Sequence, residues 1–182
     1  MKITPSKIPE VLLIEPEVHV DERGFFFETF QAMEFSDHGI PSTFVQDNHT
    51  GSRGGILRGL HYQIRRTQGK LVRVLIGDVF DVAVDLRRSS PTFGQWVGTT
   101  LSAEDHHQLW IPEGFAHGFY VLSEWAELLY KVTDYYAPEW DRTLLWNDPE
   151  VGIEWPIDEG KIPVLSEKDV NGKRLFEAEV FE

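Results

Sequence analysis

The stretch GGILRGLHYQ, residues 54–63, places a histidine inside a run that alternates like a β-strand. Successive side chains of a strand point to opposite faces of the sheet, so Arg58 and His61 cannot both face one interior in a regular strand. A bulge would bring them to the same side, and Gly59 between them is a residue at which a bulge fits. The stretch therefore predicts an irregular strand, and its histidine has functional meaning if it faces the inside of a β structure.

The next run outward, KLVRVLIG at residues 70–77, raises a similar question for a lysine. Lys70 shares a face with Val72, Val74 and Ile76, so it either reaches water from the end of the strand or is buried with them. Because Lys70 stands at the start of the strand, we expect its side chain to reach water.

Short strand-like runs separated by turn signals continue along most of the chain. Examples are VFDVAVDLR at 79–87, WVGTTLS at 96–102 and AELLYKVTDYY at 126–136. β-branched and aromatic residues at a period of two, with turns about every 8–12 residues, are typical of an all-β sandwich or barrel.

Helix is scarce, and no repeat, low-complexity tract or linker divides the chain. We expect a short helix in FQAMEFSDHG that ends at Gly39, a helical turn in SAEDHHQ capped by Ser102, and a short helix after Ser166. The segment 147–163 is rich in Pro and Gly and is expected to be an ordered loop, since its apolar residues need cover. The prediction is one domain, 1–182, with its C-terminal segment packed on the barrel.

The composition is that of an acidic protein with enough apolar residues for a core: the net charge is −13, and 41% of the residues are hydrophobic. An acidic surface repels phosphate backbones and anionic lipid, so we expect neither nucleic acid nor membrane as a partner. No run reaches transmembrane length, and the N-terminal residues do not resemble a signal peptide. The chain has no cysteine, hence no disulfide and no thiol nucleophile, which suits a cytoplasmic protein.

Seven histidines are present, but they do not form a metal-binding pattern. A metal site in such a barrel calls for His-x-His with a carboxylate and a later His. Only the adjacent pair His106 and His107 occurs, and adjacent strand residues face opposite sides. Serine-hydrolase, Walker and Rossmann motifs are also absent. We therefore expect no metal and no other cofactor.

Seven segments carry a resemblance: DERGFFFETF at 21–30, FVQDNHT at 44–50, RGLHYQ at 58–63, QGKLVRV at 68–74, PEGFAHGF at 112–119, ELLYKVTDYY at 127–136 and LSEKD at 165–169. In this order they resemble the dTDP-4-dehydrorhamnose 3,5-epimerase family over nearly the whole chain. The resemblance implies a cupin-like β-barrel, a jelly roll, that works without metal. It also implies a homodimer in which the N-terminal strands of the partner subunit supply part of the nucleotide pocket.

The resemblance also implies roles for individual residues. His61 matches the general base and Tyr130 the general acid. Asp169 matches the carboxylate that pairs with the base, and Lys70 the lysine near the keto group of the sugar. Tyr136 falls where a ring stacks on the substrate. Further substrate contacts are implied for Arg23, Glu28, Gln46, Asp47, Asn48, Arg58, His117, Lys168 and Asp141, the last standing where the family often has a longer Glu.

The implied chemistry calls for these residue types. The substrate would be dTDP-4-dehydro-6-deoxy-D-glucose, whose carbons 3 and 5 flank a ketone and so lose a proton to give an enolate. A histidine is neutral near pH 7 and accepts such a proton, and a carboxylate on its other nitrogen fixes the tautomer. A lysine ammonium stabilises the enolate oxygen, and a phenol on the opposite face returns a proton with inversion. The product would be dTDP-4-dehydro-L-rhamnose, which feeds a cell-surface polysaccharide pathway.

Other readings of the same residues stay open. A related enzyme could epimerise one carbon only, or isomerise a keto sugar, with the same base and acid. A sugar-nucleotide binding protein without activity and a metal-dependent cupin oxygenase are alternatives of other classes. Taken singly, Tyr130 could be a core tyrosine beside Leu128 and Val132, Asp169 could belong to an ordinary helix start, and Arg23 could be a plain turn residue.

Overall fold

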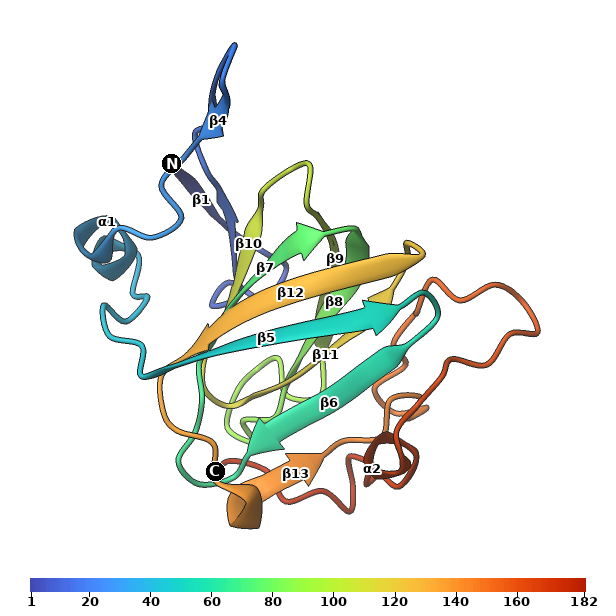
Figure 1. Ribbon diagram of the computed structural model, residues 1–182. Coiled ribbons are helices and arrows are strands. Elements are labelled where there is room, and N and C mark those ends of the chain that lie inside the picture. The colour runs from blue at the N-terminus through green and yellow to red at the C-terminus, as the bar shows by residue number, and fades with distance from the viewer.

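Two antiparallel sheets packed face to face form the body of the protein, and the computed structural model describes all residues, 1–182 (Figure 1). The elements are β1 (Lys2–Pro5), β2 (Leu12–Glu15), β3 (His19–Asp21), β4 (Gly24–Phe26), α1 (Ala32–Asp37), β5 (Gln46–Arg53), β6 (Leu57–Gln63), β7 (Lys70–Ile76), β8 (Asp78–Asp85), β9 (Trp96–Ser102), β10 (Gln108–Ile111), β11 (Phe115–Val121), β12 (Trp125–Val132), a 3-10 turn (Pro138–Trp140), β13 (Asp141–Thr143) and α2 (Glu167–Val170).

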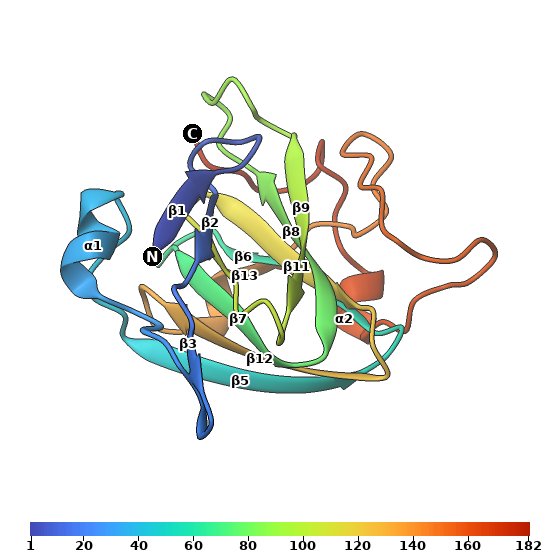
Figure 2. The same ribbon diagram turned by 90° about the horizontal axis from the view of Figure 1, so that it is seen from above.

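The larger sheet has the strand order β1-β2-β10-β7-β12-β5, and the smaller has β13-β6-β11-β8-β9. Their facing sides bury one apolar cluster, to which Val72 and Leu128 come from the larger sheet and Ala83 and Leu101 from the smaller. Figure 2 shows β5 and β12 on one side of the molecule and β9 on the other. The predicted all-β, cupin-like barrel with few short helices is confirmed.

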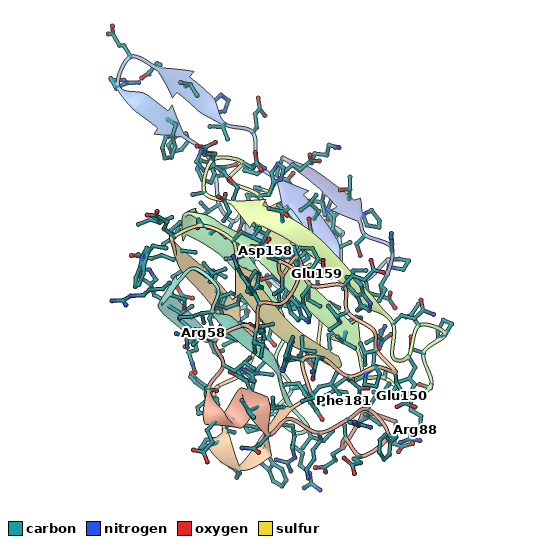
Figure 3. The ribbon with its side chains drawn as sticks, turned by 90° about the vertical axis from the view of Figure 1, so that its right-hand side faces the viewer. Arg58, Arg88, Glu150, Asp158, Glu159 and Phe181 are labelled. Carbon is teal, nitrogen blue, oxygen red and sulfur yellow. The ribbon has the colours of Figure 1, made fainter.

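The strands β8 and β11 are buried along almost their whole length because both of their faces are covered. Their inner faces meet the larger sheet, and their outer faces carry a second apolar cluster that includes Val82 and Val84. The chain after β13 packs Trp155 and Phe181 against this cluster. The tail also pairs with the barrel, since the Arg88 N–H donates to the Phe181 carbonyl at 2.8 Å (Figure 3).

The bulge predicted at Gly59 is confirmed. In the β6–β11 pair, His61 lies opposite His117 whereas Arg58 lies opposite Phe119, so β6 carries one extra residue between them. Gly59 has a φ of 129°, and a Cβ there would lie 2.5 Å from the Cα of Gly118. Only glycine fits this close approach, and the bulge turns Arg58 and His61 to the same side.

Two of the three expected helical segments are short helices, and the third is a single turn. The helix α1 ends before Gly39 and covers the outer face of the larger sheet with the buried side chain of Phe35. The helix α2 begins at the N-cap Ser166. The segment after Ser102 forms a turn over 103–105, in which the Ser102 hydroxyl accepts from the Glu104 N–H at 2.9 Å as a cap does. The turn ends at His106, whose φ of 56° interrupts a right-handed helix.

The strands β3 and β4 form a separate hairpin that projects from the barrel (Figures 1 and 3). Its apolar side chains are exposed: Val20 by 76%, Phe25 by 64% and Phe26 by 69%. At its base, the ring of Phe27 stacks on His106, and the ring of Phe25 lies tilted against the same imidazole. Neither helix of the protein is long and apolar enough to cross a membrane.

Candidate active site

A cavity of about 380 Å³ opens between the sheets where β5, β7 and β12 face β6 and β11. Its lining is mostly polar, in contrast to the apolar cluster that fills the rest of the interior. The lining residues are Gln46, Asn48, Thr50, Arg58, His61, Tyr62, Gln63, Gln68, Lys70, His117, Gly118, Phe119, Tyr130, Tyr136, Asp141 and Lys168. Most of the residues that the sequence predicts for the site are thus brought together.

His61 is backed by a carboxylate that comes from far along the chain. Its Nε2 lies 2.6 Å from Oδ1 of Asp169, which is only 2% exposed. Asp169 is the N3 residue of the capping box that begins α2, and it also accepts from the Ser166 hydroxyl at 2.7 Å. The short helix therefore holds Asp169 behind the imidazole, and the Nε2–H that donates to it leaves Nδ1 as the free acceptor.

Burial and this hydrogen bond set the protonation state of the pair. The pKa of His61 lies below its ordinary value because burial disfavours the imidazolium, although the bond to Asp169 opposes that shift. For Asp169, burial by itself raises the pKa, but the hydrogen bonds from His61 and Ser166 outweigh it and hold the pKa below its ordinary value. The resting pair is a neutral imidazole beside a carboxylate, as a general base requires.

Lys70 is buried, which corrects the expectation that it reaches water from the end of its strand. Its side chain lines the cavity, and Nζ donates to the backbone carbonyl of His61 at 3.0 Å. Burial lowers the pKa of Lys70 to about 8, against the opposing charges of Asp141 and Asp81. The strand end lies against a polar cavity and not against bulk water, which strand position alone could not reveal.

Tyr130 faces the same cavity from the other sheet. It lies on β12 of the larger sheet, whereas His61 lies on β6 of the smaller one. Its neighbours on the same face, Leu128 and Val132, are fully buried, but Tyr130 is only partly covered because the cavity begins there. Burial raises the pKa of Tyr130, with the charge of Arg58 partly opposing, so the phenol keeps its proton near neutral pH.

Polar side chains join at the rim of the cavity. Asp141 accepts from the Tyr136 hydroxyl at 3.0 Å and from the Lys168 ammonium. The Tyr136 ring is 54% exposed and is available for stacking. Gln46 accepts from the Tyr136 N–H at 3.1 Å and donates to Asn48 Oδ1 at 2.8 Å, which orients both amides. Asp141, although shorter than Glu, links β13 to α2 across this rim.

Arg58 brings a guanidinium to the cavity from the bulged strand. Its Nε donates to the Ser52 hydroxyl at 2.9 Å, which ties it to β5 at the edge of the barrel (Figure 3). The bulge at Gly59 is what allows Arg58 and His61 to line one cavity.

The structure places two predicted substrate contacts, Arg23 and Glu28, outside this cavity. Arg23 lies on the projecting hairpin and donates to Asp21, two residues away. Glu28 follows the hairpin and is exposed. Neither residue lines the cavity of its own chain. A substrate role for them therefore requires that the hairpin reaches the cavity of another subunit.

Asp47 is a correction to the predicted site. It lies between Gln46 and Asn48 on β5, and alternation turns its side chain to the outer face of the sheet. There it forms an ion pair with Lys131 at 2.9 Å. Its neighbours in sequence line the cavity, whereas Asp47 does not.

Asp81, the partner of His117, is not among the residues predicted for the site. Asp81 is completely buried on β8, and its Oδ1 lies 2.9 Å from His117 Nε2. The sequence does contain a sign of this pair: Asp81 is the single acidic residue inside the apolar run VFDVAV, and a buried carboxylate is unusual unless it is paired. Gln63 was also missed as a support: its side chain binds the backbone of Arg66, Tyr135 and Ala137 and so holds the loop that carries the rim tyrosine.

Comparison with known sequences identifies the family. A family model described as dTDP-4-dehydrorhamnose 3,5-epimerase matches residues 5–177. The dTDP-4-dehydrorhamnose 3,5-epimerase of Pseudomonas aeruginosa is 60% identical over 182 residues, covering 100% of this chain and 99% of that protein.

Solved structures of the same fold belong to the same group of enzymes. A dTDP-6-deoxy-D-glucose-3,5-epimerase from Legionella pneumophila, in complex with dTDP-4-keto-L-rhamnose, has a TM-score of 0.93 and 54% identity, covering 98% of this chain and 94% of that chain. ChmJ, a 3'-monoepimerase from Streptomyces bikiniensis in complex with dTDP-quinovose, has a TM-score of 0.88 and 34% identity, covering 95% and 87%. With a family model matched over nearly its whole length and such identities to full-length relatives, the chain belongs to the dTDP-4-dehydrorhamnose 3,5-epimerase family.

Proposed function

We propose that the protein epimerises dTDP-4-dehydro-6-deoxy-D-glucose at carbons 3 and 5 to give dTDP-4-dehydro-L-rhamnose, a step of dTDP-L-rhamnose biosynthesis. The observation that carries this proposal is the pair His61 and Tyr130, a neutral base and a protonated phenol that line one cavity from opposite sheets. Inversion at a carbon needs removal of a proton from one face and delivery to the other. The base on one cavity wall and the phenol on the opposite wall can act on the two faces of a carbon bound between them.

Proton removal falls to His61. Nδ1 of its imidazole takes a proton from the carbon next to the ketone, while the Nε2–H stays bonded to Asp169. The carboxylate stabilises the imidazolium that forms and does not itself need to take the proton. Positioned bases of this kind contribute roughly 10²–10⁴-fold to the rate.

The negative charge that develops on the ketone oxygen calls for a cation. Lys70 is buried, lines the cavity and is tied to the backbone of His61, so its ammonium lies on the base side of the site. An ion in such a water-poor position stabilises an enolate more than a surface lysine would. Tyr130 then returns a proton to carbon from the opposite wall, which inverts the centre.

The remaining lining residues suit a nucleoside diphosphate. Arg58 and Lys168 supply positive charge for the diphosphate, and the exposed ring of Tyr136 supplies a stacking surface for the base. We further propose a cytoplasmic homodimer in which the β3–β4 hairpin of one subunit carries Arg23 and Glu28 to the cavity of the other. The exposed apolar residues of the hairpin support this, since such surfaces are typical of interfaces.

Deuterium counting in D₂O tests the proposed reaction. Purified enzyme is incubated with substrate, and the product is analysed by mass spectrometry and proton NMR. Two deuterons per converted sugar, at carbons 3 and 5, are expected. One deuteron would instead identify a single-carbon epimerase, an alternative kept open because the 3'-monoepimerase ChmJ shares the fold. No exchange with retained dTDP binding would indicate a binding protein.

A further inference from the structure

A second histidine–carboxylate pair lies beside the first. His117 is 8% exposed and lines the cavity, and its Nε2 lies 2.9 and 3.0 Å from the two carboxylate oxygens of Asp81. In the β6–β11 pair, His117 lies directly opposite His61. Side chains opposite each other on neighbouring strands have Cβ atoms roughly 5 Å apart, so the two imidazoles share one wall of the cavity.

Asp81 differs from the other buried carboxylate of the same strand. Asp85 accepts hydrogen bonds from Arg87, Ser90 and Thr92, a set that ties a loop to the barrel. The Asp81 side chain has His117 as its single hydrogen-bond partner. Because a buried carboxylate is costly unless it is paired, Asp81 is placed to act on His117. It holds the Nε2–H, leaves Nδ1 for the cavity, and stabilises the imidazolium when His117 takes up a proton.

The proposed double epimerisation, on which this inference rests, creates a need for such a group. After the first inversion His61 holds the proton it removed, and Tyr130 has lost the proton it delivered. The second inversion requires a neutral imidazole and a neutral phenol again. A single-carbon epimerase meets this problem only between substrates, whereas a double epimerase meets it with a sugar still in the site.

We propose that His117, positioned by Asp81, takes the proton from His61 between the two inversions. An N–H bond at His61 Nδ1 breaks and one forms at His117 Nδ1, along the cavity wall that both rings share. No electrons are transferred. The imidazolium at 117 is paired with Asp81, and the base at 61 is neutral for the second carbon. A water molecule protonates the Tyr130 phenolate, and the hydroxide that forms is neutralised by the proton that His117 later releases to solvent. Asp81 is thus a positioning residue for the second of the two steps.

The test compares two isosteric variants in D₂O. In Asp81→Asn the amide still accepts from His117 but no longer stabilises an imidazolium. The expected result is a ratio of singly to doubly deuterated sugar that rises by roughly ten-fold or more over wild type, because the second exchange slows more than the first. Asp85→Asn is the matched control, since Asp85 is equally buried on β8 but bonds away from the cavity. It should lower the melting temperature and leave the ratio at the wild-type value.

A second variant keeps the test decisive if Asp81→Asn does not fold. His117→Gln retains a side-chain N–H for Asp81 but cannot carry a proton, and it should raise the same ratio. If either folded variant slows both exchanges equally, or changes neither, the relay is wrong. If wild type itself incorporates one deuteron, the proposed double epimerisation fails, and the relay with it. Two deuterons in wild type with an unchanged ratio in the variants would overturn the relay alone.

Discussion

The cavity walls and the β3–β4 hairpin carry charged residues predicted for the same substrate, yet the structure holds them in opposite ways. Lys70 is 7% exposed and lies among the charges of other cavity residues, whereas the Arg23 side chain is 85% exposed and bonds to Asp21 beside it. Burial changes the pKa of a group and strengthens its electrostatic effect. A group on a projecting hairpin behaves as in water until another surface covers it. The walls should therefore determine catalysis, and the hairpin should matter through assembly.

The largest expected effect is on the base. His61→Asn should lower kcat/KM by about 10²–10⁴-fold and slow deuterium exchange at both carbons to the same degree, because no other neutral acceptor is backed by Asp169. Binding of dTDP, followed by calorimetry, should persist. His49→Asn is the control: His49 lies on the outer face of β5, paired with Glu127, and should keep full activity. Normal exchange in the His61 variant would remove this residue from the mechanism.

The second prediction concerns the cavity lysine. Lys70→Met keeps most of the side-chain volume but removes the ammonium, so kcat should fall by about 10²–10³-fold while KM changes less. Lys131→Met on the outer side of β12, where Lys131 pairs with Asp47, should have little effect. A drop in substrate affinity with unchanged kcat would show that Lys70 binds the substrate without stabilising the enolate.

The pH profile of kcat/KM should carry the signature of the two wall residues. Burial lowers the pKa of Lys70 to about 8, so the ammonium is present below that pH and is lost above it. Activity should fall by about ten-fold per pH unit on the alkaline side. Burial also lowers the pKa of His61, so the neutral base persists to pH values below the ordinary histidine range. Two results would contradict these roles of Lys70 and His61: a kcat/KM that stays constant up to pH 10, or a loss of activity on acidification that already begins above pH 7.

The rim should show a smaller effect, confined to binding. Tyr136→Ala removes a stacking surface worth about 1 kcal/mol, which corresponds to roughly five-fold in the Kd for dTDP. Tyr136→Phe keeps the ring and loses only the bond to Asp141, so it should bind nearly as wild type. Isothermal titration measures both, and equal losses in the two variants would assign the effect to the hydroxyl.

The smallest effect is expected on the hairpin. Arg23→Ala should raise KM no more than a few-fold, since exposed charges contribute little. Mixing Arg23→Ala with His61→Asn subunits sharpens the comparison. If the hairpin serves the partner, mixed dimers contain one cavity with both an intact base and an intact hairpin, and activity should exceed the sum of the separate variants. Failure to complement, with dimers present by light scattering, would confine Arg23 to its own subunit.

Much of the fold was predictable because its cause is local. Period-two apolar residues predicted the strands, Gly59 predicted the bulge, and Ser166 predicted the start of α2. The turn after Ser102 also has a local cause, the cap hydroxyl, but it stops at His106, which takes a left-handed conformation beside the hairpin aromatics. The positions of Arg23 and Asp47 show the limit of residue matching: a resemblance names residues, but alternation and chain path decide which cavity they face.

The sequence by itself determined an all-β architecture and, through the resemblance of seven ordered segments, the family. These conclusions depend on the periodicity of apolar residues and on the order of motifs, both of which can be read directly from the sequence. Only the tertiary structure decided that Lys70 is buried and that His117 is paired with Asp81. It also brought Asp169 to His61, from the helix after the barrel. Burial and pairing arise from contacts between distant segments, and the free energy of a charge depends on what surrounds it in space, which no local pattern contains.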